Sequence, residues 1–214
     1  PLIPFHPSLS ELSDFRLNRK PILFVTKEEH GALRSLKIAD EFNLNPWILG
    51  SGCEYRRLNL IAELNPFIIF PLDFPAKPKV KDPYLALQYS TEQLKHWDMA
   101  PDNILKVFDK GLRFSLTSGT LKNKKEFRVN LQRIIDRGLP KSVALSALTT
   151  FPAEAMGVEK TMGKIQPGYI ANLVVTDGDY FNSKNRVTSL WINGEEIFVA
   201  DRHKTSVEGE WELE

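Results

Sequence analysis

A chain of 214 residues with 42% hydrophobic content is long enough for one large domain or two small ones. Its 28 basic residues nearly balance its 27 acidic residues, so the net charge of +1 argues against nucleic acid or an anionic membrane as a partner. A single cysteine, Cys53, excludes an intramolecular disulfide framework and any metal site built from several cysteines.

Membrane and targeting segments are not apparent in the sequence. No apolar run approaches the roughly 20 residues of a membrane span, and the first residues lack the order of a signal peptide. We expect a soluble protein of a bacterial cytoplasm or periplasm, and the sequence does not choose between these compartments. The start at Pro1 rather than Met suggests a fragment or a processed chain.

The first part of the chain alternates between apolar strands and amphipathic helices. Residues 1–20 hold three prolines and no clear period, which favours an extended linker. Apolar runs and helical spacing then predict, in order, a strand at 22–26, a helix at 28–42, a strand at 47–49, a helix at 54–64 and a strand at 66–70. This alternation is typical of a parallel sheet with right-handed crossovers.

The second part begins with a long loop, because residues 71–83 hold four prolines. The elements predicted after it are helices at 91–97, 101–110, 126–137, 142–150 and 152–156, with a strand at 112–117 between the second and third helices. Near the end, Asn193-Gly194 separates the alternating run 187–192 from Ile197, and an apolar run lies at 173–176. These features predict a small β-meander that closes in a tight hairpin.

Two stretches of the sequence carry a family resemblance. GLPKSVALSALTTFPAEAMGV, at 138–158, and GKIQPGYIANLVVTDGD with VTSLWINGEEI, at 163–179 and 187–197, resemble the closing segments of amidohydrolase-superfamily enzymes, especially the imidazolonepropionase-like branch. The resemblance implies an α/β fold. Residues 21–158 would form half of a metal-dependent (β/α)8 barrel, with strands similar to strands five to eight. Residues 159–214 would form a segment of the small composite β-sandwich beside the barrel.

The same resemblance implies where metal ligands should be. Amidohydrolases carry one His each on strands five and six and an Asp on strand eight, which hold divalent cations and activate a water molecule. In this chain the matching positions are Val25, Gly50 and Ser118, and none of these side chains can replace the family ligand. A shift of one residue would not restore an imidazole. We therefore expect no catalytic residue and no metal ligand in this chain.

The remaining pocket candidates are weak. His30 lies near a helix start, where a surface role is the usual one. Backbone N–H groups after two strands could meet an anion, at Ser51 and Gly52 and at Gly119 and Thr120, although turn geometry alone explains both sequences.

Three functional hypotheses follow. The first is a degenerate, non-catalytic amidohydrolase-related domain, or pseudoenzyme, with no cofactor. The second is part of an active hydrolase of non-peptide C–N bonds, whose zinc or other divalent metal is held by a missing amino-terminal half or a companion domain. The third is a module that binds a small molecule at the barrel mouth.

The expected partner is a second set of strands. Four parallel strands leave two open edges, and inward side chains such as Phe24, Ile48 and Ile68 would lack an opposite layer. We expect the missing amino-terminal half of the barrel or a second copy, as a homodimer, to cover them.

Overall fold

The structure is a computed structural model and describes residues 7, 13 and 15–199. Most of the expected linker, and residues 200–214 of the expected small β-domain, lie outside the described residues. No helix in the described ranges is long and apolar enough to cross a bilayer.

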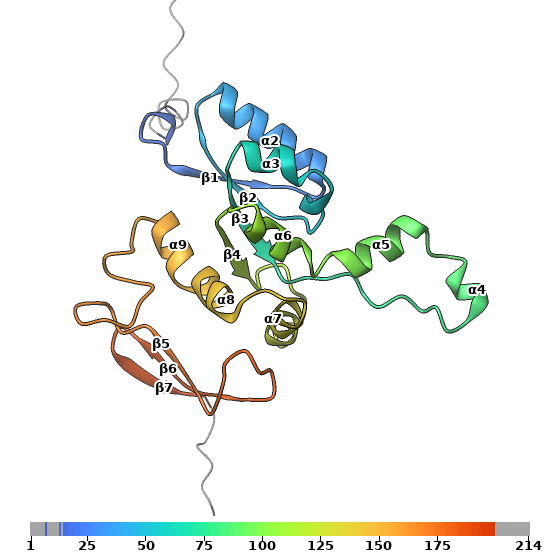
Figure 1. The fold of residues 1–214 in the computed structure, drawn as a ribbon. Helices are drawn as coiled ribbons and strands as arrows, with labels where there is room; N and C mark the ends of the chain where they lie inside the picture. The colour runs from blue at the N-terminus through green and yellow to red at the C-terminus, as the bar shows by residue number, and fades with distance from the viewer. Residues whose placement is uncertain (1–6, 8–12, 14, 200–214) are drawn as a thin grey trace, which may run out of the picture.

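Four strands form one parallel sheet in the order of the sequence (Figure 1). They are β1 (Pro21–Val25), β2 (Asn45–Leu49), β3 (Phe67–Pro71) and β4 (Phe114–Thr117). Each strand pairs with the next in parallel register. The predicted α/β fold with half a barrel is therefore confirmed, and β1 and β4 are the two outer strands.

Helices connect and cover these strands. They are α2 (Glu29–Glu41), η1 (Glu54–Arg56), α3 (Leu58–Glu63), α4 (Pro83–Ala86), α5 (Thr91–Met99), α6 (Asn103–Asp109), α7 (Glu126–Asp136), α8 (Lys141–Leu148) and α9 (Thr150–Ala155). In Figure 1, α4 and α5 form an arm that projects from the body beyond the carboxyl ends of the strands.

Two helices differ from the sequence prediction. The helix predicted at 54–64 is divided into η1 and α3, because Arg57 leaves helical geometry at φ −132°. At the end of the predicted proline-rich loop at 71–83, α4 forms one short helix. The Asp82 side chain accepts a hydrogen bond from the Tyr84 backbone N–H, and Pro83 occupies the first helical turn.

The apolar core lies between the parallel sheet and its helices. Ile48 and Ile68 are neighbours in register on β2 and β3, and Phe114 continues the row on β4. All three side chains are buried, and residues of α2, α3, α6, α7 and α8 complete the same cluster. This arrangement places the helices on one face of the sheet.

The prediction that Phe24, Ile48 and Ile68 point inward is wrong, because these side chains pack against the helix layer. Side chains alternate along a strand, so the opposite, concave face carries their neighbours. On β1 these neighbours are Leu23 and Val25, which are 49% and 70% exposed. The sheet therefore has an uncovered apolar face, as the sequence predicts, but on β1 this face is formed by Leu23 and Val25 rather than by Phe24.

A second sheet follows the barrel segment. It contains β5 (Leu173–Thr176), β6 (Val187–Ile192) and β7 (Glu195–Phe198) in antiparallel order. The predicted hairpin is confirmed, with Asn193 and Gly194 at φ 52° and 88° between β6 and β7. Both residues have positive φ, as the favoured two-residue hairpin turn requires.

A guanidinium group joins the two parts of the structure. Arg128 of α7 donates hydrogen bonds to the carbonyl oxygens of Tyr180, Asn182 and Asn185, at 2.9, 2.8 and 2.5 Å. Its Cζ also lies 5.0 Å from the centre of the Tyr180 ring. The loop between β5 and β6 is therefore fixed to α7 by this side chain, and Gln132 of the same helix accepts two further hydrogen bonds from Ser183 of the loop.

Candidate functional site

The carboxyl ends of β1 to β4 form the candidate site, because parallel barrels carry their reactive groups there. Val25 is the last residue of β1 and lies exposed on the concave face. Ser118 follows β4, and its carbonyl oxygen accepts a hydrogen bond from the Lys124 ammonium group. Neither position presents an imidazole or a carboxylate at this edge of the sheet.

Gly50 lies in a different environment from the one that the sequence suggests. A Cβ atom added to Gly50 would lie 2.7 Å from Cδ1 of Phe70, a buried side chain of the core. Leu49, not Gly50, is the register partner of Val25 and shares its face. A histidine at position 50 would therefore displace Phe70. The prediction that Gly50 occupies the position of the strand-six histidine of the family is not favoured by this packing.

Glu54 organises the loop after β2. It is fully buried, and one carboxylate oxygen accepts hydrogen bonds from the Ser51 backbone N–H at 2.5 Å and from Ser51 Oγ at 3.0 Å. The other oxygen accepts from Asn103 Nδ2 at 2.7 Å, and Asn103 Oδ1 accepts from the Tyr55 backbone N–H at 2.7 Å. The Ser51 backbone N–H, which the sequence suggested as a donor to a bound anion, thus donates to the Glu54 carboxylate instead.

In the second turn with candidate N–H groups, the N–H of Gly119 is also occupied from within. The Gly119 backbone N–H donates to Thr117 Oγ1 at 3.0 Å, and the Gly119 carbonyl accepts from Lys124 Nζ at 3.0 Å. Gly52 has φ 82° and lines a cavity of only 20 Å³ at the barrel mouth. A cavity of this size holds about one water molecule.

A short hydrogen-bonded chain lies above this loop. Arg56 Nε donates to the Tyr55 hydroxyl at 3.4 Å, and that hydroxyl lies 3.4 Å from His96 Nδ1. Burial and the nearby Arg56 charge lower the pKa of His96, which favours a neutral ring that accepts at Nδ1.

Cys53 Sγ lies 3.8 Å from both ring nitrogens of His96. Burial raises the pKa of the Cys53 thiol. A reactive cysteine and histidine pair needs the opposite shifts, so this pair packs as a neutral thiol and a neutral imidazole.

The other sequence candidate, His30, lies apart from this chain. Its side chain is 52% exposed and its Nε2 is 3.9 Å from Glu29. Among the described residues, no group of three or more His, Cys, Asp or Glu side chains is arranged to hold a metal ion. Sequence reasoning missed the roles of Glu54, Tyr55 and Asn103, because an amphipathic pattern does not reveal which polar side chain turns inward.

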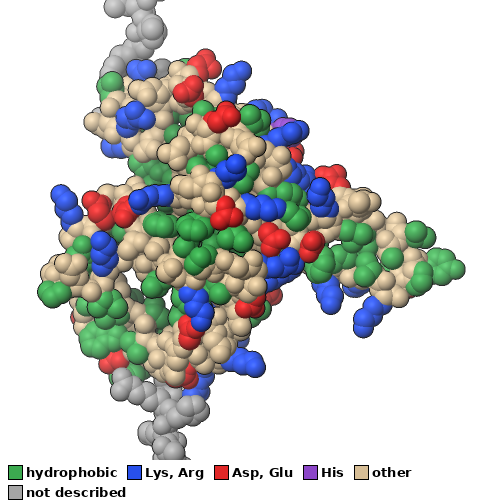
Figure 2. All heavy atoms as spheres, in the orientation of Figure 1, with side chains coloured by type: hydrophobic (Ala, Val, Ile, Leu, Met, Phe, Trp, Pro, Cys, Tyr) green, Lys and Arg blue, Asp and Glu red, His purple; other side chains and the backbone are tan. Residues whose placement is uncertain are grey.

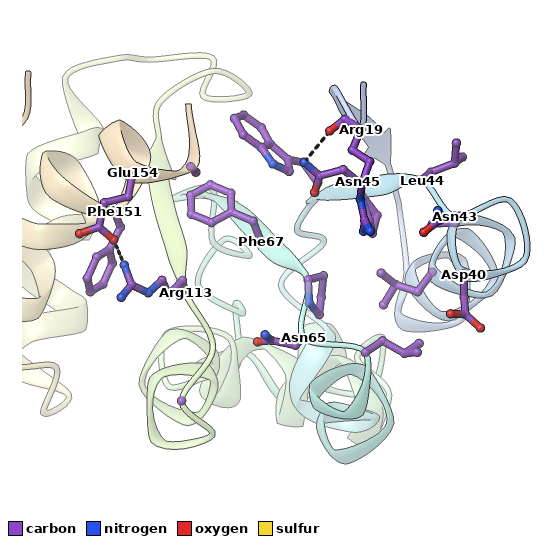
Figure 3. Close-up of a pocket in the computed structure, with 18 residues that line it drawn as sticks. Arg19, Asp40, Asn43, Leu44, Asn45, Asn65, Phe67, Arg113, Phe151 and Glu154 are labelled. Atoms are coloured by element: carbon purple, nitrogen blue, oxygen red, sulfur yellow. Dashed lines mark hydrogen bonds and ion pairs between the residues drawn. The ribbon is translucent and has the colours of Figure 1, made fainter. Parts of the chain in front are cut away.

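A larger hollow lies at the other end of the strands. It measures 730 Å³, and its wall runs from Arg19 and Asn45 beside β1 and β2 to Arg113 and Glu154 beside β4 (Figure 3). Phe67 lies between these two sides. The wall is built at the amino ends of the strands, together with residues of α2 and α9, so the hollow lies away from the expected mouth.

Comparison with known proteins supports the fold. An amidohydrolase from Thermotoga maritima MSB8 is 24% identical, with a TM-score of 0.71, and covers 92% of this chain. A Xaa-Pro dipeptidase with bound methionine is 14% identical, with a TM-score of 0.62, and covers 88%. The matched part is 48% of the first structure and 47% of the second, so this chain spans about half the length of these relatives.

Two sequence comparisons point to the same family for part of the chain. The amidohydrolase tasK of Hapsidospora irregularis is 39% identical over 57 residues, which are 27% of this chain and 6% of that protein. A sequence model described as the amidohydrolase family matches residues 100–197. The family-model match includes the segments 138–158, 163–179 and 187–197, whose sequences resemble amidohydrolases. The finer assignment to the imidazolonepropionase-like branch stays a prediction. Residues 100–197 of this chain are therefore similar to the amidohydrolase family.

Proposed function

We propose that this segment is a non-catalytic part of an amidohydrolase-family protein, which keeps the scaffold without the metal site. One observation carries the proposal: the strand ends that should supply metal ligands present Val25, Leu49 and Ser118 at the edge of the sheet. Valine and leucine have no lone pair, and a serine without an adjacent base is a poor ligand and a poor proton shuttle.

The scaffold needs a second half. The concave face, which would be the interior of a closed barrel, exposes Leu23 and Val25. In closed barrels this interior is filled by layers of side chains from alternate strands. A companion half of the barrel, or a second copy, would supply those layers and cover the strand edges.

Metal content tests the proposal. The chain is purified without chelators, incubated with excess zinc or manganese, desalted and analysed by plasma emission. We expect far less than one metal ion per chain. Stoichiometric metal would contradict the proposal and would direct the work to assays of C–N bond hydrolysis. A Val25→Ser variant is a matched control. Its metal content should equal that of the wild type if position 25 is not near a metal site.

A further inference from the structure

A separate hollow lies outside the barrel mouth, between α2, η1 and α5. We call it the rim hollow; it has a volume of 540 Å³. Figure 2 shows basic and acidic side chains intermingled on the side of the body from which the α4 and α5 arm projects. The rim hollow lies beyond the carboxyl ends of β1 and β2, the side of a parallel sheet on which α/β proteins bind ligands.

Positive charge exceeds negative charge on its wall. The wall contains the cations Arg56, Arg57 and Lys95, and the carboxylates Glu29 and Glu92. Arg56 pairs with both carboxylates, at 3.6 Å from Glu29 and 2.9 Å from Glu92. Arg57 and Lys95 form no salt bridge within the described part of the chain. The rim hollow therefore has spare positive charge.

The two carboxylates are held differently. The Glu29 side chain is 10% exposed, whereas the Glu92 side chain is 72% exposed. An exposed ion pair contributes little to stability, so the contact between Arg56 and Glu92 is easily exchanged for another anion. Glu92 thus occupies the position that an incoming carboxylate would take.

The same wall has an apolar part. Tyr55 and Met99 line it, and Arg56 Cζ and Lys106 Nζ lie 5.8 and 5.6 Å from the centre of the Tyr55 ring. Both distances are within the range of a cation–π contact, so the Tyr55 ring is held near two cations. The wall thus combines a charged part and an apolar part within one cavity of ligand size.

We propose that the rim hollow binds a small carboxylate with an apolar body. The carboxylate pairs with Arg56 and Lys95 and displaces Glu92, while the apolar body lies against Tyr55 and Met99. This site is independent of the proposed loss of metal chemistry, since it uses none of the strand-end positions that carry that proposal.

Calorimetric titration with benzoate at low salt tests the site, beside acetate, which lacks the apolar body, and benzyl alcohol, which lacks the charge. Benzoate is expected to bind saturably and more tightly than either. Lys95→Gln is expected to weaken benzoate binding about threefold, and Glu92→Gln to strengthen it about threefold, which is the effect of one exposed charge. Lys37→Gln, on the exposed surface of α2, is the control and is expected to bind as the wild type does.

Any of three outcomes would overturn the proposal. The first is an absence of saturable benzoate binding. The second is binding that Lys95→Gln and Glu92→Gln leave unchanged, and the third is equal binding of benzyl alcohol. Both variants replace exposed side chains, and equal thermal midpoints verify that each is folded. The opposite signs expected for them cannot arise from a general loss of structure.

Discussion

Glu54 is the side chain on which the loop after β2 depends. It is a fully buried carboxylate that accepts three hydrogen bonds, two from Ser51 and one from Asn103. A buried donor left without an acceptor costs about 1 to 3 kcal/mol, and more when its lost partner was charged. These residues are adjacent in space only because the β2 loop meets the start of α6.

Replacement of Glu54 by alanine should therefore be severe. We expect Glu54→Ala to lower the free energy of unfolding by about 3 kcal/mol, because Ser51 and Asn103 lose their shared acceptor. Urea unfolding followed by circular dichroism measures the change. Glu63→Ala, on the exposed side of α3, is the control, with an expected effect below about 0.5 kcal/mol. Equal midpoints for the two variants would mean that the loop does not rely on this carboxylate.

At the scale of elements, α7 holds the small sheet through Arg128. The Arg128 guanidinium donates to three carbonyl oxygens of the loop between β5 and β6, and Gln132 accepts hydrogen bonds from the backbone N–H and hydroxyl of Ser183. Only arginine offers several donors in one plane with this reach.

We expect Arg128→Gln to release the loop while the parallel sheet stays intact. Hydrogen exchange followed by mass spectrometry should show faster exchange in residues 177–198 and unchanged exchange in β1 to β3. Lys125→Gln, at the start of α7, is the control because its side chain is exposed. Uniformly faster exchange across both sheets would instead mean that Arg128 supports the whole fold.

At the scale of the whole molecule, the half barrel has uncovered apolar surface on its concave face. An isolated chain of 24.4 kDa is expected to self-associate through Leu23, Val25 and the strand edges. Sedimentation velocity should show species above the monomer mass, reduced by Val25→Lys and unchanged by Ile165→Lys, an exposed position beyond α9. A single monomeric species across the accessible concentration range would contradict this expectation.

The sequence predicts the order of the helices and strands well. It predicts less well which side chains of each strand face the helices. Apolar runs and turn pairs such as Asn193-Gly194 locate the strands, because these signals are local. Whether Ile48 and position 50 face the helices or the concave side depends on which face of the sheet the helices cover. The local sequence does not indicate which face this is. The positions of Glu54 and Asn103, 49 residues apart, depend in the same way on the assembled sheet.

The strand order has a consequence for how this molecule forms. Each parallel strand pairs with the one that precedes it in the chain, so every new strand finds its partner already synthesised. Loop closure between neighbours costs less entropy than pairing between distant segments. These four strands can therefore join the sheet one after another, in the order in which the ribosome releases them.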